Sequence, residues 1–254
     1  MISLETLLHS TSPVLFDGGF GACLQHRGLE AGSAPETWNL SRPEAVRRLH
    51  EEFVAAGSMV IETNTFGANA RRFHAGEVKD SLAESVRAAC RIATEASAGR
   101  VLVAGSTGPL GELIEPYGDL SIDQARAAFL EQYRVLHECG IRILLIETMM
   151  SLEEALLALE AAKETGFDAI GVTMTFEPTP QGPRTAFGVF PAQAARELSA
   201  AGAQIVGSNC GSGFDVMRNV AREFLDATSV PILIQPNAGI PRSGARGPVY
   251  PETP

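Results

Sequence analysis

Lysine is nearly absent from this chain of 254 residues, and arginine carries most of its positive charge. Only Lys79 and Lys163 are present, and neither ends a β-branched run, so no lysine is placed at a strand end to form a Schiff base with a carbonyl substrate. The net charge of −10 disfavours nucleic acid and anionic membranes as partners. Imine-forming aldolases and nucleic-acid-binding proteins are therefore both disfavoured.

Long apolar segments are also missing. No apolar run approaches the roughly 20 residues that a membrane-spanning helix needs. The first residues, MISLETLLHSTSP, have no basic start, and Glu5 and Thr6 interrupt their apolar stretch, so they do not resemble a signal peptide. We expect a cytoplasmic protein.

Cysteine is scarce and scattered. The four cysteines, at positions 23, 90, 139 and 210, have no Cys-x-x-Cys spacing, which disfavours a disulfide framework and favours a reducing compartment. Cys90 lies among alanines in a helical segment and is expected to pack in the core. Cys210 alone ends a β-branched run, where a thiol can bind a metal or act as a nucleophile.

A short β-branched run, a turn and an amphipathic helix recur along the whole chain, roughly every 30 to 40 residues. The predicted strands are 14–19, 59–66, 101–108, 143–149, 169–176, 205–211 and 232–237. The predicted helices are 43–56, 80–98, 121–139, 151–164, 191–201 and 213–227. Strands that are apolar on both faces and alternate with helices predict a parallel sheet covered by helices. No linker divides the chain, so we expect a single domain over 1–254.

Three helices are expected to begin at capping boxes, in which a serine is followed three residues later by Glu or Gln. These pairs are Ser41 with Glu44, Ser121 with Gln124, and Ser151 with Glu154. The acidic residues in these pairs are therefore interpreted as helix caps and not as catalytic groups.

An open doubly wound sheet and a closed barrel both fit this alternation. The first strand is followed by DGGFGACLQ, which lacks the Gly-x-Gly-x-x-Gly spacing of a dinucleotide fold. Polar residues follow nearly all the strands and are not confined to one switch point, which favours a TIM-type (β/α)8 barrel. Seven strands are counted where such a barrel has eight.

The polar residues at the strand ends predict a pocket for a small polar molecule. They are Asp17, Glu62, Thr63, Asn64, Ser106, Thr107, Glu147, Thr148, Asn209, Cys210, Gln235 and Asn237. Asp17 and Glu147 directly follow apolar runs, where a buried charge needs a partner such as a ligand ammonium group. The same two carboxylates also fit an acid/base pair of a glycosidase or an enolising enzyme. None of the five histidines ends a strand.

Six segments together resemble one family. LFDGGFGACLQHRG, GSMVIETNTFGAN, GSTGPLGEL, LLIETM, GSNCG and QPNAGIP are similar, in order and spacing, to motifs of the homocysteine S-methyltransferase family. The resemblance covers about residue 13 to the end of the chain. The IETNTFGAN and QPNAG stretches look most like the homocysteine domain of cobalamin-dependent methionine synthase.

The resemblance implies a (β/α)8 barrel that holds zinc through three cysteines at strand ends. Cys210 matches the first of these zinc ligands. Asp17 and Glu147 match the carboxylates that hold the homocysteine amino group, and Thr63 matches a substrate-contacting position. Asn209, in the same Asn-Cys element as Cys210, is also predicted to bind substrate.

The implied activity is transfer of a methyl group to the thiol of L-homocysteine, which gives methionine. A free thiol is only partly ionised at neutral pH, and zinc binds the homocysteine sulfur as the nucleophilic thiolate. The family's donors include betaine, S-methylmethionine and methylcobalamin, and the resemblance to methionine synthase favours methylcobalamin, presented by a further domain or protein. Two alternatives remain, a metal-free relative that only binds an amino acid or thiol and a carboxylate-dependent barrel hydrolase.

One departure from the family bears on zinc. The family's other two ligands are adjacent cysteines on the eighth strand, and neither matches a cysteine of this chain. The chain ends at VYPETP, which resembles the lead-in to the seventh helix. The chain is therefore expected to be either a fragment or a natural relative without the zinc site. As written, it should not hold zinc tightly, and the unpaired edges of its sheet should promote self-association.

Overall fold

The central element is a parallel sheet of six strands in consecutive order, β1-β2-β3-β4-β5-β6. The computed structural model describes residues 3–30, 32–71, 82–211 and 213–237, and the backbone of 242–244 and 247–249. The strands are β1 (Val60–Glu62), β2 (Leu102–Thr107), β3 (Ile143–Met149), β4 (Ala169–Met174), β5 (Ile205–Cys210) and β6 (Ile232–Pro236). This order without reversal is that of a barrel, and it confirms the predicted barrel-type α/β class.

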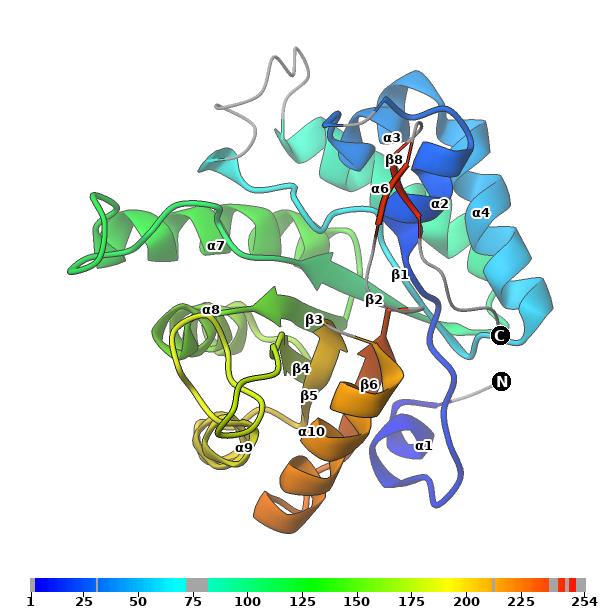
Figure 1. Cartoon of the computed structure of the whole chain (residues 1–254). Helices are drawn as coiled ribbons and strands as arrows, with labels where there is room; N and C mark the ends of the chain where they lie inside the picture. The colour runs from blue at the N-terminus through cyan, green and yellow to red at the C-terminus, as the bar shows by residue number, and fades with distance from the viewer. Residues whose placement is uncertain are drawn as a thin grey trace.

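The helices surround the outside of the curled sheet (Figure 1). Those that alternate with the strands are α4 (Pro43–Ala56), α6 (Leu82–Ser97), α7 (Ile122–Glu138), α8 (Leu152–Thr165), α9 (Pro191–Ala200) and α10 (Phe214–Ala227). The shorter helical segments are α1 (Leu4–His9), α2 (Phe20–His26), η1 (Pro35–Thr37) and α3 (Trp38–Ser41). Each of the six long helices lies within two residues of its predicted bounds.

The first predicted strand, 14–19, is much shorter than expected. Phe16 forms only an isolated parallel bridge with Val60, beside which Asp17 N donates to Val60 O at 3.0 Å. Gly18 and Gly19 follow at once and do not continue the pairing. At the other end of the sheet, Gln235 Nε2 donates to the Asp17 carbonyl at 3.3 Å, so the sheet is curled enough for its two ends to touch.

Both faces of the sheet are buried, as the continuous apolar runs predict. Leu144 and Ile146 pack in a core cluster with residues of the surrounding helices, whereas Ile143 and Leu145 pack with inward-facing residues of other strands. Leu7 of α1 joins this inner cluster. The side chains that alternate along β3 thus divide between an outer helix-covered core and an inner barrel-like core.

The three expected caps have different outcomes. Ser121 and Gln124 form the complete capping box of α7. Ser151 accepts from Glu154 N, but the Glu154 carboxylate accepts from Leu110 N and does not reach back to the cap. The Ser41 prediction is wrong, because Ser41 ends α3 and donates to Thr37 O, while Pro43 starts α4.

Two short strands near the end of the chain were not predicted. β7 (Arg242–Gly244) and β8 (Gly247–Val249) pair with each other in an antiparallel hairpin. The predicted lead-in to a seventh helix, at 249–254, lies almost entirely outside the described residues.

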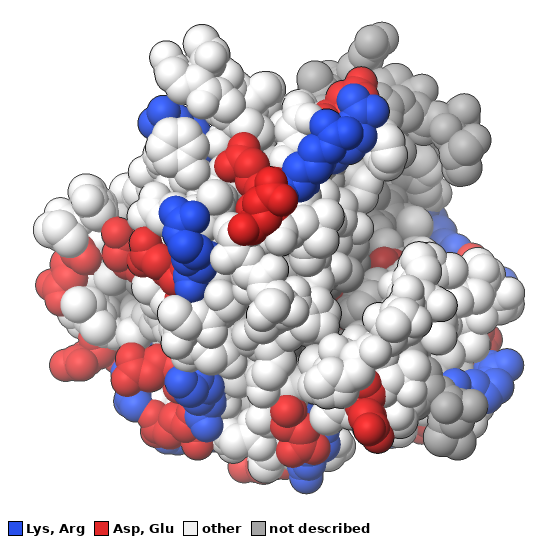
Figure 2. All heavy atoms as spheres, turned by 90° about the horizontal axis from the view of Figure 1, so that it is seen from below, with Lys and Arg blue, Asp and Glu red and all other residues white. Residues whose placement is uncertain are grey.

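The surface carries mixed charge. On the face shown in Figure 2, arginine and lysine side chains lie among aspartates and glutamates, and the described residues there form no continuous basic patch. Within the described part of the chain, no helix combines the length and apolar character that crossing a membrane requires.

Candidate functional site

A cavity of about 460 Å³ lies at the carboxyl ends of the strands. It brings together all five residues for which the sequence predicts a site role. These are Asp17, Thr63, Glu147, Asn209 and Cys210. Phe20 and Phe66 add apolar wall. Of the polar strand-end residues, Thr107 is not among those lining the cavity, because its hydroxyl donates to Gln132 of α7 on the outside of the sheet.

Asp17 is buried at one side of the cavity, with 5% of its surface exposed. Its Oδ2 accepts from Glu62 N at 3.0 Å, while its Oδ1 is buried and accepts from no other described residue. Burial, and after it the charge of Glu147, raises the pKa of Asp17 to about 8, against the lowering effect of the Glu62 N–H. Asp17 therefore presents a free oxygen for which a donor from a ligand would be the natural partner.

Glu147 follows the apolar run of β3 and is largely buried. Its Oε1 accepts from Ser106 Oγ, and its Oε2 accepts from Asn209 Nδ2 at 3.2 Å. Burial raises the pKa of Glu147, and the hydrogen bond from Ser106 lowers it. Two donors, one from β2 and one from β5, thus fix the carboxyl group at the cavity wall.

Glu62 is a further carboxyl group in the same cavity, one that the sequence places at a strand end without a site role. Burial raises the pKa of Glu62 well above its usual range, and the charges of Glu147 and Asp17 raise it further. Its side chain hydrogen-bonds to Glu147 and accepts from Gln235 Nε2 at 3.3 Å. The signal was present in the sequence, since Glu62 directly follows an apolar run, as Asp17 and Glu147 do.

Thr63 lines the cavity, but its hydroxyl is engaged in the sheet. Thr65 Oγ1 donates to Ser106 O at 2.7 Å, so the proton between Thr63 Oγ1 and Thr65 Oγ1, 2.7 Å apart, belongs to Thr63. Thr63 Oγ1 also accepts from Ser106 N at 3.2 Å. One lone pair of the Thr63 hydroxyl is left, so it can accept one hydrogen bond from a ligand. Substrate contact by Thr63 stays a prediction.

Asn209 joins the ends of three strands. Its Oδ1 accepts from Thr148 N and from Thr173 Oγ1, each at 2.8 Å. Its Nδ2 donates to Thr148 Oγ1 at 2.6 Å and to Glu147. These bonds use its amide within the protein, so direct substrate binding by Asn209 stays a prediction, and a role in holding Glu147 is the stronger expectation.

Two residues of the cavity wall have left-handed backbone, Thr148 with φ of 61° and Cys210 with φ of 58°. This region is uncommon for residues other than glycine and is unfavourable for a β-branched side chain. The hydrogen bond from Thr148 N to Asn209 helps to hold Thr148 in this conformation. Strained backbone of this kind is found preferentially at functional sites.

Cys210 is partly exposed to the cavity. Its Sγ lies 3.8 Å from Thr148 Oγ1 and 3.5 Å from Asn209 Nδ2. Burial raises the pKa of its thiol, so the neutral form is favoured. Within the ranges that the structure describes, no group of three or more His, Cys, Asp or Glu side chains is arranged to hold a metal ion. Cys210 and its described neighbours therefore do not fit a complete zinc centre.

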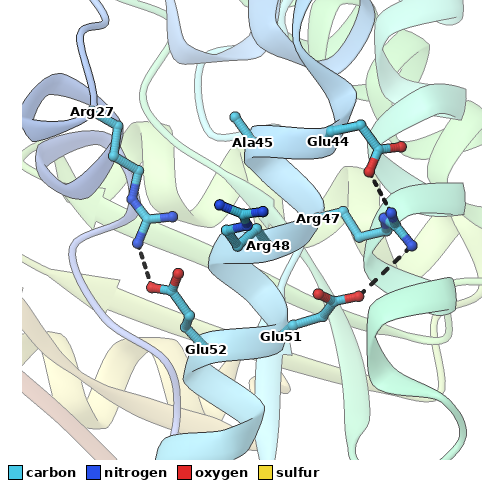
Figure 3. Close-up of a pocket in the computed structure, with 7 residues that line it drawn as sticks. All are labelled: Arg27, Glu44, Ala45, Arg47, Arg48, Glu51 and Glu52. Carbon is cyan, nitrogen blue, oxygen red and sulfur yellow. Dashed lines mark hydrogen bonds and ion pairs between the residues drawn. The ribbon is translucent and has the colours of Figure 1, made fainter.

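A second hollow of the surface differs in kind (Figure 3). It lies over α2 and α4, and its charged groups pair with each other, Arg27 with Glu52 and Arg47 with both Glu44 and Glu51. Solvent-exposed ion pairs of this type contribute little to the stability of the fold, and they form no buried binding site. The cavity at the strand ends remains the better candidate.

A curled parallel sheet with a polar cavity at its carboxyl edge defines a barrel-type protein with a small-molecule site. The chain belongs to the homocysteine S-methyltransferase family, whose model, described as Homocysteine S-methyltransferase, matches residues 14–254. This confirms the resemblance found in the sequence motifs.

Curated relatives support the same family. The chain is 34% identical over 211 residues to betaine–homocysteine S-methyltransferase 1 of Sus scrofa, with 80% of this chain and 72% of the relative covered. It is 35% identical over 214 residues to the protein of the same name from Xenopus tropicalis, with 82% and 51% covered. The chain thus spans about half the length of most of the curated relatives it matches.

A solved structure supports the fold. The metallated form of the homocysteine methyltransferase MmuM from Escherichia coli superposes with a TM-score of 0.77 at 20% identity, over 90% of this chain and 85% of that one.

Proposed function

We propose that this chain is the homocysteine-binding part of a methyltransferase that methylates the thiol of L-homocysteine to give methionine. One observation carries the proposal, namely that a single cavity holds two buried carboxyl groups, Asp17 and Glu147, together with the Cys210 thiol. The relatives are named for the methylation of homocysteine from betaine, which agrees with this substrate.

In this proposal Asp17 and Glu147 receive the substrate ammonium group. Asp17 Oδ1 is a buried acceptor without a described partner, and Glu147 is held at the cavity wall by Ser106 and Asn209. A cation between two carboxyl groups would offset the desolvation that raises the pKa of both.

Zinc enters the proposal through Cys210 alone. Zinc, when bound, would hold the substrate sulfur as a thiolate at neutral pH. Cys210 would be one ligand, and two further protein ligands would have to come from outside the described residues. The competing proposal is a metal-free relative that binds the amino acid only, and its support is that Cys210 is the one cysteine among the described residues that line the cavity.

The methyl donor is part of the proposal only as a class. The names of the relatives point to betaine, and the IETNTFGAN and QPNAG motifs point to methylcobalamin. Betaine, S-methylmethionine and methylcobalamin each carry an electrophilic methyl group. The thiolate attacks the methyl carbon, and the nitrogen, sulfur or cobalt that carried it leaves with the electron pair of the broken bond.

The test is methionine formation by the complete gene product, with L-homocysteine, added zinc and each of the three donors in turn. A methyltransferase should form methionine with at least one donor and should lose this activity when zinc is chelated. Homocysteine binding that is indifferent to zinc, without turnover, would favour the metal-free relative. No affinity for homocysteine under any condition would favour a hydrolase.

A further inference from the structure

Glu62 occupies a central place among the carboxyl groups of the cavity. Its backbone N–H donates to Asp17, and its side chain contacts both Glu147 and Gln235. Two carboxyl groups can share a hydrogen bond only when one of them carries a proton. The contact between Glu62 and Glu147 therefore contains a proton.

The neighbouring donors decide which of the two carboxyl groups carries that proton. Glu147 accepts from Ser106 Oγ and from Asn209 Nδ2, and both bonds favour its ionised form. Glu62 accepts one longer bond, from Gln235 Nε2 at 3.3 Å, and it is buried, whereas Glu147 is partly exposed. Glu62 is thus the protonated partner and donates to Glu147.

Charge balance in the cavity leads to the same assignment. Asp17, Glu62 and Glu147 lie together, and no basic side chain is among the described residues that line the cavity. Burial raises the pKa of all three groups, and the charge of Glu147 raises the pKa of Asp17 and of Glu62 further. A protonated Glu62 relieves this repulsion until a cation enters.

We propose that Glu62 is a positioning residue, which donates a hydrogen bond to Glu147 in the ligand-free cavity and releases its proton when a ligand ammonium group binds. The O–H bond of Glu62 breaks, its electron pair stays on the carboxylate oxygen, and the proton passes to solvent. The ammonium group then supplies the positive charge that the proton supplied before. This inference rests on the amino-acid ligand of the proposed function.

The exchange has a defined pH dependence. Protons compete with the ammonium group for the same carboxyl groups, so affinity should rise with pH while Glu62 is protonated in the free protein, by about tenfold per pH unit for one proton released. Asp17, Glu36, Glu147 and Cys210 line the same cavity, and Asp17 is also able to take up a proton. The informative quantity is therefore the difference between the wild type and a variant at Glu62.

The experiment is isothermal titration calorimetry of the complete gene product with L-methionine at about pH 7, in buffers of different ionisation enthalpy. Methionine carries the ammonium group but no thiol, so a proton released from the substrate sulfur does not enter the count. Glu62→Gln keeps a donor toward Glu147 and an acceptor for Gln235 but has no proton to release. The wild type should release about one proton more than Glu62→Gln, whose affinity should change less between about pH 6 and about pH 8.

Ser106→Ala is the matched control. It also removes a hydrogen bond to Glu147, so it should weaken methionine binding while the number of protons released stays that of the wild type. Equal proton release by the wild type and Glu62→Gln would overturn the inference. Failure of the folded wild type to bind methionine at all would overturn the proposed function and the exchange together.

A ligand-free measurement tests the protonated Glu62 on its own. A carboxyl group whose pKa is raised in the folded state stays protonated there while the unfolded chain ionises, so its contribution to stability falls as pH rises from about 4 toward 8. The unfolding free energy of Glu62→Gln should fall less over this range than that of the wild type. An equal pH dependence of the unfolding free energy in the wild type and Glu62→Gln would overturn the protonated state of Glu62, whatever the result of the methionine titration.

Discussion

The side-chain amide of Asn209 donates to Glu147 Oε2 at 3.2 Å and so ties the end of β5 to the end of β3 across the strand between them. The same side chain also accepts from Thr173 of β4. Three strand ends are thereby held in one arrangement around the cavity. The position of Glu147 depends on a residue that the sequence places 62 positions away.

Asn209→Asp should destabilise the fold and weaken amino-acid binding. The substitution keeps the shape but removes the donors to Glu147 and Thr148 and adds a negative charge beside Glu147. We expect a loss of about 2–3 kcal/mol in unfolding free energy at neutral pH, measured by urea denaturation, with a smaller loss in acid. Thr173→Val, which removes one hydrogen bond to Asn209 and adds no charge, should cost about 1 kcal/mol. Equal losses for the two variants would contradict this account.

Asp17→Asn and Glu147→Gln should each weaken homocysteine binding by about 1.5–3 kcal/mol, the scale of a hydrogen bond to a charged group. The reason is that each change removes a carboxyl group from the side of the cavity assigned to the ammonium group. Equilibrium binding and turnover should be measured together in the complete gene product. Binding that survives while turnover disappears would instead identify the pair as proton-transferring groups.

Cys210→Ser should abolish zinc binding in the complete gene product, because serine is a poor zinc ligand beside sulfur. The 254-residue chain should not retain stoichiometric zinc after dialysis, since one thiol does not form a centre. Metal analysis of both proteins, with Cys23→Ser as the control that keeps its zinc, measures this. Tightly held zinc in the short chain that disappears with Cys210→Ser would show that other ligands are present.

His50→Leu should make the fold more resistant to acid. His50 is fully buried against Phe20, with ring centroids 4.6 Å apart, and neither ring nitrogen has a described partner. Burial lowers the pKa of His50 to about 4, so the unfolded chain takes up a proton below about pH 6.5 while the folded protein does not. Stability from this residue is therefore complete above about pH 6.5 and lost as pH falls toward 4.

The unfolding free energy of His50→Leu minus that of the wild type should be about 2–3 kcal/mol larger at about pH 4.5 than at neutral pH. Unfolding monitored by circular dichroism at both pH values gives this quantity. His26→Gln, which changes an exposed histidine of α2, should keep the acid dependence of the wild type. Identical acid dependence in His50→Leu and the wild type would show that another group controls it.

Much of the fold could be predicted because its signals are local. Helix bounds follow from the period of apolar residues and from caps such as Ser121 with Gln124, which the structure confirms. The failed cap at Ser41 shows the limit of such reasoning, because Pro43, two residues further along, offers a competing helix start. The first predicted strand, 14–19, forms only one bridge, to Val60. Strand pairing depends on residues that are distant in the sequence, so its extent could not be predicted from the local pattern.

Some features of the candidate site could likewise be predicted from local sequence signals, and others could not. The rule that a carboxylate directly after an apolar run indicates a site residue identifies Asp17 and Glu147. The same rule would also have identified Glu62. The engagement of Thr63 and Asn209 within the sheet was not visible in the sequence, because their partners belong to other strands.

The sequence by itself determined the alternation of strands and helices, the burial of both sheet faces and the polar residues at the strand ends, since each depends on neighbours a few positions away. The tertiary structure alone decided that Gln235 reaches the carbonyl of Asp17, 218 positions earlier, and that Asp17, Glu62 and Glu147 share one cavity. Their raised pKa values follow from desolvation, with repulsion added at Asp17 and Glu62, and both arise only when the curled sheet brings these groups together out of water.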